Sequence, residues 1–290
     1  MTTKEHLEGH WREWRHQRIA TLTRPYGWAS LVAQHWLEEG EDGVELESLP
    51  GQWSVRDSRV IYTPPSEGAN LSVDGHYPVA PVEIVPGRNM VYSNGDSVPV
   101  YFGECEVDTV VRTNDAGSKI FAVRVRDPRE AARKDLSSLD TFDYDPAWRV
   151  PAVYEPLATL DVEASTVETG VRETTSVIGR LSFELEGKQF VPLVIGKETP
   201  SGIQPVLQIR DASSGKSTYG AGRVVDLEFV SGTRDRIDYV DFNYLAALPC
   251  AFTNFVTCPI APPENHIPVE ISAGEKKPAE VVARVATYAR

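Results

Sequence analysis

Two polar clusters near the C-terminal end of the sequence carry side chains that could transfer protons. Asp241 and Asn243 close a strand-like run, and Glu264, Asn265 and His266 follow a proline-rich stretch. A carboxylate and an imidazole two positions apart can act as general acid and base when they share a cleft. We therefore predict Glu264, Asp241 and His266 as proton-transfer residues. The alternative is that these polar groups bind free backbone N–H groups and hold an irregular segment in place.

Both clusters belong to one segment, residues 241–274, whose composition is unusual for a simple connection. It contains five of the 21 prolines and two of the three cysteines, Cys250 and Cys258. The spacing from these cysteines to His266 lacks the close cysteine pairing of structural zinc sites, so we predict no metal and no other cofactor. Buried thiols are the expected state, and a catalytic thiol would need His266 as its base. We expect the segment to form one wall of a ligand pocket.

Two arginines could orient an anionic group of a ligand. Arg126 shares one face of a predicted strand with Arg124, which makes that face cationic within an acidic protein. Arg223 follows the segment 219–222. This segment has two glycines but lacks the third glycine and the following helix of a phosphate-binding loop. The alternative for each arginine is an internal ion pair. For Arg126, the expected partner is the acidic loop 143–145. The remaining predicted ligand contacts are Trp148, Tyr219, Asn243, Asn265 and Phe252.

The composition limits the range of partners. The chain has 290 residues and a net charge of −13 at pH 7. A diffuse negative charge opposes contact with nucleic acids and anionic membranes, so we expect neither as a partner. The N-terminus lacks the pattern of a signal peptide, and no apolar run approaches the ~20 residues of a membrane span. The expected location is therefore the cytoplasm, and the composition is compatible with a homo-oligomer.

One long helix is predicted at residues 2–20, before Arg24-Pro25. Its spacing places four residues on a single face: Leu7, Trp11, Trp14 and Arg18. We expect the two tryptophans to dock the helix on the body of the protein rather than to bind a ligand. The end of the chain, residues 278–290, is consistent with either a short helix or a frayed terminus.

Turn signals recur at intervals of roughly eight to twelve residues through most of the chain and indicate antiparallel strands. Asp74-Gly75 and Asn94-Gly95, for example, favour tight hairpin turns. The expected fold class is all-β, with antiparallel sandwich- or barrel-like layers, an N-terminal helix and a proline-rich irregular C-terminal segment. We divide the chain into three parts: a helical arm (1–26), an N-terminal β-sandwich-like part (27–115) and a C-terminal β-barrel-like part (116–290).

Motifs spread along the chain resemble those of the domain of unknown function 1684 family of bacterial and archaeal proteins. The resemblance rests on the segments 27–28, 36–40, 124–128, 144–150, 210–215, 218–223, 241–243, 249–252, 258–259, 262–265 and 273–276. It extends over nearly the whole chain and implies a β-rich fold, and the family brings no established reaction. Where the family pattern has Tyr-Asn-Pro, this chain has Ala246, Ala247 and Leu248. The departure implies a larger and more apolar pocket, so we include these three residues among the ligand contacts.

The leading hypothesis is an all-β protein that binds a small, possibly anionic organic molecule. It would be a cofactor-independent enzyme, of lyase, isomerase, cyclase or hydrolase type, that uses acid–base or electrostatic catalysis. The alternative is a non-catalytic protein-interaction module, because the opening part resembles a phosphopeptide-binding sandwich in its layout. A pocket lined by the predicted residues would favour the first hypothesis, and an exposed apolar patch would favour the second.

Overall fold

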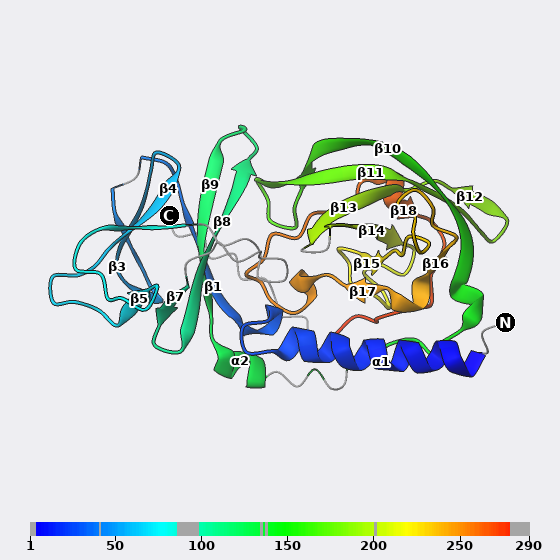
Figure 1. Ribbon diagram of the computed structural model, residues 1–290, viewed down its shortest axis with the longest axis horizontal. Helices are drawn as coiled ribbons and strands as arrows, with labels where there is room; N and C mark the ends of the chain where they lie inside the picture. Colours follow the sequence, from blue (N-terminus) through cyan, green and yellow to red (C-terminus); the bar gives the residue numbers. More distant parts are fainter. Residues whose placement is uncertain are drawn as a thin grey trace.

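The computed structural model describes residues 4–40, 42–85, 99–133, 136, 139–199 and 202–278. Two β-rich units lie side by side, and one long helix runs along the C-terminal unit (Figure 1). The turn expected at Asn94-Gly95 and the C-terminal helix or frayed end considered for residues 278–290 lie outside this part, apart from residue 278. The expected all-β fold with an N-terminal helix is confirmed.

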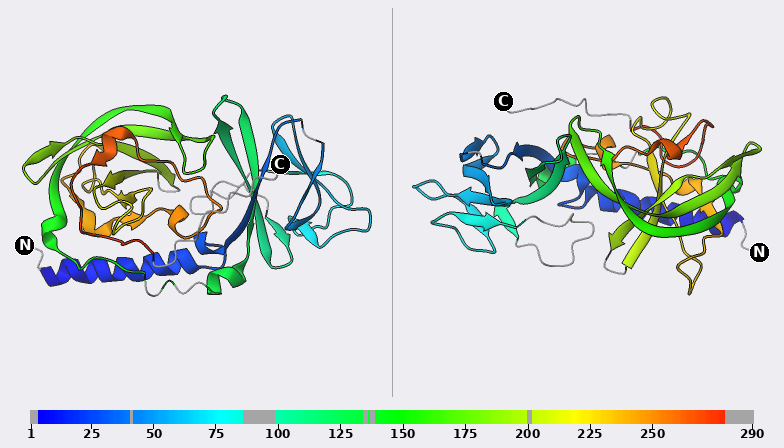
Figure 2. Two further views of the ribbon diagram at one scale, coloured as in Figure 1. Left: turned by 180° about the vertical axis from the view of Figure 1, so that it is seen from behind. Right: turned by 90° about the horizontal axis from the view of Figure 1, so that it is seen from above.

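The long helix, α1 (Lys4–Thr23), begins within the predicted range and ends just before Arg24-Pro25. Its tryptophans dock it on the C-terminal unit, as expected from the periodicity of the sequence. The indole Nε1 of Trp11 donates a hydrogen bond to the carbonyl oxygen of Asn243 at 2.9 Å. The ring of Trp14 meets that of Tyr244 edge-on, with centroids 5.2 Å apart. Figure 2 shows from two further directions that α1 lies along this unit.

The N-terminal unit is a sandwich of two β-layers. Its outer layer has the strand order β2-β3-β4-β6, and its inner layer contains β1, β9, β8, β7 and β5. The bounds are η1 (Trp28–Ser30), β1 (Leu31–Leu37), β2 (Val44–Leu46), β3 (Leu49–Arg56), β4 (Arg59–Thr63), β5 (Leu71–Val73), β6 (Val82–Ile84), β7 (Val100–Phe102), β8 (Cys105–Asn114) and β9 (Lys119–Arg126). Trp53, Tyr62 and Phe121 are buried between the layers.

Strand β9 packs with the N-terminal core. The boundary expected at residue 115 falls in the turn between β8 and β9, and that division of the chain stays a prediction. Because side chains alternate along a strand, β9 directs Phe121, Val123 and Val125 into the N-terminal core. Arg124 and Arg126 therefore point to the opposite face, toward the C-terminal unit.

The C-terminal unit is built from long antiparallel strands joined by irregular segments. It contains η2 (Pro146–Trp148), β10 (Arg149–Ser165), β11 (Val171–Leu185), β12 (Lys188–Phe190), β13 (Leu193–Thr199), β14 (Gly202–Asp211), β15 (Arg223–Asp226), β16 (Tyr239–Asp241), η3 (Phe242–Tyr244), β17 (Ala246–Ala247), η4 (Pro249–Ala251), η5 (Pro263–Asn265) and β18 (His266–Ile267). Leu181, Phe183, Leu207, Ile209 and Phe242 lie in its core. Parallel pairing occurs between β14 and β18. The short helix α2 (Pro128–Arg133), which follows β9, lies beside η1, β1 and α1.

The two units share one sheet. At its junction β8 pairs with β11 through Asn114 with Val171 and Thr113 with Arg172. The path of paired strands runs from β1 to β17, so among the described residues the sheet remains open at both ends instead of closing on itself. No helix in the described ranges combines the length and the apolar character that a membrane span requires.

Candidate functional site

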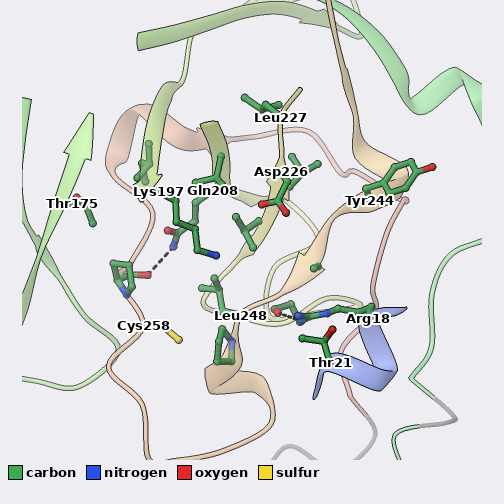
Figure 3. A pocket seen from close by; sticks show the side chains of 18 of the residues that line it. Arg18, Thr21, Thr175, Lys197, Gln208, Asp226, Leu227, Tyr244, Leu248 and Cys258 are labelled. Atoms are coloured by element: carbon green, nitrogen blue, oxygen red, sulfur yellow. Dashed lines mark hydrogen bonds between the residues drawn. The ribbon is translucent and has the colours of Figure 1, made fainter. Parts of the chain in front are cut away.

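A cavity of about 1030 Å³ lies between α1 and the concave side of the C-terminal sheet (Figure 3). The helix supplies one wall with the side chains of Leu7, His10, Trp14, Gln17, Arg18 and Thr21. Three of these belong to the face that the sequence predicted for docking. The face of α1 that packs on the body of the protein therefore also covers the cavity.

Strands β13, β14, β15 and β17 form the floor of the cavity. The strand register aligns Ile195, Val206 and Asp226 in one row across the sheet. A second row contains Gln208, Val224 and Ala246. Because successive side chains alternate between faces, neighbouring residues such as Leu207 and Ile209 enter the core on the other side. The floor thus presents aliphatic surface with a few polar groups.

Lys197 and Asp226 are the charged groups at the centre of this floor. Lys197 extends into the cavity from β13 (Figure 3). Burial lowers the pKa of its ammonium group, while the neighbouring carboxylate of Asp226 opposes that change and Arg18 adds to it. Asp226 is exposed on β15. A lysine with a lowered pKa exchanges its proton more readily near neutral pH than an exposed lysine does.

Arg18 and Glu275 both bond to the backbone of Ala247 in strand β17. Arg18 Nη2 donates to the carbonyl oxygen of Ala247 at 2.7 Å, and Glu275 Oε2 accepts from the amide of Ala247 at 2.6 Å. The two side chains also form an ion pair at 2.9 Å, and Glu275 is almost completely buried. We call this arrangement the Arg18–Glu275 clamp. It holds β17 at Ala247, and Ala246, Ala247 and Leu248 line the cavity, while their role as ligand contacts stays a prediction.

One end of the cavity contains Asp241 and Arg149. The Asp241 carboxylate accepts hydrogen bonds from the amide and the side-chain Nδ2 of Asn243, and Arg149 Nε lies 4.0 Å from its Oδ2. Burial raises the pKa of Asp241, although the Asn243 hydrogen bonds and Arg149 act in the opposite direction. Tyr244 lies nearby, and burial raises its pKa to about 12. Asp241 is therefore a cavity carboxylate that accepts a proton more readily than a free one.

The other end of the cavity contains a half-buried arginine, Arg112, a buried one, Arg124, and an acid. Arg112 forms an ion pair with Glu173 at 3.1 Å and donates from Nε to Thr257 Oγ1 at 2.8 Å. Burial raises the pKa of Glu173, while both arginines oppose that rise. Arg124 donates from Nε to Oε1 of Gln34 at 2.9 Å. Burial lowers the pKa of Arg124 to about 10.

Of the three residues predicted for proton transfer, the structure places only Asp241 in the cavity. Glu264 and His266 are exposed and are not among the residues that line it. Glu264 lies within the 3-10 turn η5 and His266 directly follows it, and in this turn Asn265, rather than its neighbours, points inward. Asn265 accepts from the amide of Leu193 and donates to the carbonyl oxygens of Leu193 and Gln208. It holds the irregular segment against β13 and β14, as the alternative interpretation expected.

Arg126 and Arg223 have internal partners instead of facing the cavity. Arg126 forms an ion pair with Asp108 at 3.0 Å, so the expected alternative partner, the loop 143–145, is not the one seen. Arg223 is completely buried, pairs with Asp211 at 3.4 Å and donates to the carbonyl oxygen of Ile271 at 2.9 Å. Both arginines therefore tie distant parts of the chain together.

The segment that precedes Arg223 is also structural. Tyr219 donates its hydroxyl hydrogen to the carbonyl oxygen of Cys250 at 2.6 Å. Gly222 has a φ of +98°, and a Cβ atom there would collide with the carbonyl oxygen of Ile209. The glycines thus allow a close backbone approach, which agrees with the sequence interpretation that this is not a phosphate loop.

The predicted aromatic walls lie beside the cavity rather than in its lining. Trp148 packs edge-on against Phe242, with ring centroids 6.5 Å apart. Phe252 is buried, and the guanidinium carbon of Arg18 lies 5.8 Å from its ring centroid. Asn243 is buried and bonds to the backbone of Asp145 through both atoms of its amide group. These side chains therefore pack behind the residues that line the cavity.

The two cysteines of the segment are free, buried thiols. Cys258 lines the cavity, and burial raises its pKa well above the usual value, helped by a hydrogen bond with Cys250. A thiol with a raised pKa is a poor nucleophile. Within the described ranges, no three His, Cys, Asp or Glu side chains lie close enough together to hold a metal ion.

Several cavity residues were missed by the sequence analysis. Lys197, Gln208 and Glu173 sit singly within strands, without a motif around them. One signal was present for Gln208, because a polar residue between Leu207 and Ile209 must point to the face opposite the apolar core. For Arg124, the sequence indicated the correct face of β9 but not which arginine on it would be paired.

Comparison with known proteins supports the resemblance noted in the sequence. Residues 134–276 match the family described as Protein of unknown function (DUF1684). The chain is also similar to the solution NMR structure of an uncharacterised protein of Haloarcula marismortui, at 26% identity over 48% of this chain and 75% of that one, with a TM-score of 0.39. No curated protein gave a match. The match covers only part of the chain, and through residues 134–276 this protein resembles the DUF1684 family.

Proposed function

We propose that this protein binds a small organic molecule in the cavity beneath α1. The observation that carries the proposal is the cavity itself, because its volume of about 1030 Å³ lies at the upper end of those of ligand sites. Aliphatic rows on the floor can bury the carbon skeleton of a ligand, and the few charged groups between them can fix its orientation. The wall at Ala246–Leu248 adds space where the family pattern has larger side chains.

The titratable groups in this cavity support acid–base catalysis on the bound molecule. Burial shifts the pKa of Lys197 downward and those of Asp241 and Glu173 upward, so all three move toward neutral pH. Groups with such shifts are suited to proton transfer at the pH of a cell. In this proposal Asp241 keeps its predicted role, and Lys197 and Glu173 replace Glu264 and His266. The reaction needs no redox cofactor.

A cavity-filling variant tests the binding proposal. The fluorescent dye 8-anilinonaphthalene-1-sulfonate serves as a probe because it is small, largely apolar and anionic. Ala246→Phe places a ring at the end of the row formed by Gln208, Val224 and Ala246, whereas Val153→Phe adds the same ring to a side chain that is 70% exposed on β10. We expect saturable dye binding to the natural protein and to Val153→Phe, with at least a tenfold weaker affinity in Ala246→Phe.

The same experiment separates the proposal from its rival. Equal dye affinity in all three proteins would mean that the dye binds elsewhere and that the cavity is not a ligand site. A protein-interaction module would give that result, since its partner would meet the outer surface. Once a converted substrate is found, Lys197→Met and Asp241→Asn should each lower kcat while they leave the melting temperature within a few degrees of the natural value.

A further inference from the structure

Arg124 is a buried cation with an incomplete set of partners. Its side chain is 2% exposed and lines the end of the cavity nearest the N-terminal unit. Its Nε donates to Gln34, as described above. Among the described residues, its two terminal nitrogens have no hydrogen-bond partner, and no carboxylate lies within 4.0 Å of the guanidinium. These nitrogens are also absent from the polar atoms sealed away from solvent, so they face the open space of the cavity.

The acids around Arg124 in the described ranges do not pair with it directly. Arg126, two positions along the same strand face, is paired with Asp108. Arg112 is paired with Glu173. A third carboxylate, that of Glu168, accepts from Nε2 of Gln34 and is connected to Arg124 only through that amide. Burying an unpaired charge is costly, and a bound anion would remove that cost.

We propose that the ligand of this cavity is an organic monocarboxylate whose carboxylate group is held by the terminal nitrogens of Arg124. This inference rests on the proposed function. The planar guanidinium matches the two oxygens of a carboxylate through parallel hydrogen bonds. The single unpaired charge favours a monoanion over a phosphate dianion. The rest of the ligand lies on the aliphatic rows of the floor, toward Ala246.

The lining as a whole disfavours a polyanion such as a nucleotide. As many acidic as basic side chains face the cavity, so there is no general positive field. The positive charge is concentrated at one point by the pairing pattern. A ligand with one carboxylate and an otherwise neutral skeleton fits this distribution.

Matched probes test the carboxylate directly. We would measure by calorimetry and ligand-observed NMR the binding of 4-phenylbutanoate, its neutral amide and phenyl phosphate. The proteins are the natural chain, Arg124→Gln and the control Arg149→Gln, which removes a cavity cation from the opposite end. We expect the natural chain to bind the carboxylate at least tenfold more tightly than the amide and the phosphate ester, because a charged hydrogen-bonded pair contributes roughly ten- to hundredfold in affinity.

Arg124→Gln should abolish the preference for the carboxylate and leave the affinity for the amide within threefold. Arg149→Gln should retain the preference. The inference is wrong if the preference survives in Arg124→Gln, if the amide or the phosphate ester binds as tightly as the carboxylate, or if the carboxylate shows no binding at millimolar concentrations. Ala246→Phe distinguishes this failure from that of the proposed function. If it weakens dye binding while the preference for the carboxylate fails, only the inference is wrong; if the dye binds that variant unchanged, the cavity itself fails as a ligand site.

Discussion

Two arginines on one face of β9 offer a sharp test of how charge is arranged at the cavity end. Arg124 and Arg126 are equally buried, at 2% exposure each, and lie two residues apart. Arg126 has an ionic partner in Asp108, whereas Arg124 has one hydrogen bond and no ion pair among the described residues. Replacing each by methionine keeps most of the side-chain volume and removes the charge. The two variants should therefore differ greatly in stability.

The expected magnitudes follow from the partners. Burial lowers the pKa of Arg124 from 12.5 to about 10, which at 1.36 kcal/mol per pKa unit amounts to about 3 kcal/mol of destabilisation of the charged form. Loss of the bond to Gln34 costs about 1 to 3 kcal/mol in the opposite direction. Arg124→Met should thus leave the unfolding free energy within about 2 kcal/mol of the natural value. Arg126→Met leaves Asp108 without its partner and should cost about 3 to 5 kcal/mol.

Urea denaturation without ligand, followed by tryptophan fluorescence and circular dichroism, measures both values. We expect Arg126→Met to unfold at clearly lower urea concentration than Arg124→Met, with similar slopes for both transitions. Equal losses of more than 3 kcal/mol in the two variants would refute the reasoning, because Arg124 would then be a structural cation like its neighbour.

Three further predictions concern the stability of the fold. Glu275→Ala breaks the Arg18–Glu275 clamp and should lower the unfolding free energy, measured by chemical denaturation, by about 3 to 5 kcal/mol. The control Glu8→Ala removes an exposed ion pair on α1 and should change the unfolding free energy by less than about 1 kcal/mol. Similar losses in the two variants would show that the clamp is not needed. Gly222→Ala should lower the melting temperature far more than Gly170→Ala, because both glycines have positive φ but an added Cβ would collide with backbone atoms only at Gly222. Equal decreases in melting temperature would mean that the positive φ alone, and not the collision, causes the destabilisation. Burial raises the pKa of Glu106 from 4.5 to about 7, so its stabilising contribution is complete below pH 4.5 and is lost as the pH rises to about 7. At pH 8, Glu106→Gln should therefore be more stable than the natural chain by up to about 3 kcal/mol, and screening by solvent at this partly exposed position reduces that difference. An unfolding free energy with the same pH dependence in both proteins would contradict this prediction.

The fold was largely predictable because its main signals are local. The 3.6-residue periodicity of α1 and the turn dipeptides between strands depend on neighbouring residues only. The docking face of α1 followed from Trp11 and Trp14, and the wall at Ala246–Leu248 followed from a departure from the family pattern. The packing of β9 in the N-terminal core was not predictable, since the turn at residues 115–117 gives no indication of which core the next strand enters.

The site was predicted only in part because it depends on pairing between distant strands. In the register of β8 and β9, Asp108 stands opposite Arg124, yet its carboxylate pairs with Arg126 along the diagonal. Periodicity cannot distinguish these two outcomes. Glu264 and His266 were predicted from their types, but the orientation of their turn is set by Asn265, which points inward to bond with β13 and β14.

Methyl NMR of the alanine-labelled protein tests the central claim most directly. Ala246 and Ala247 line the cavity, whereas Ala69 is half-buried just before β5 in the N-terminal unit and serves as an internal control. On titration with 4-phenylbutanoate or its amide, we predict saturable shifts of the Ala246 and Ala247 methyl signals with a single affinity, and none for Ala69. Unchanged Ala246 and Ala247 signals at a probe concentration that saturates the protein would contradict a ligand site beneath α1.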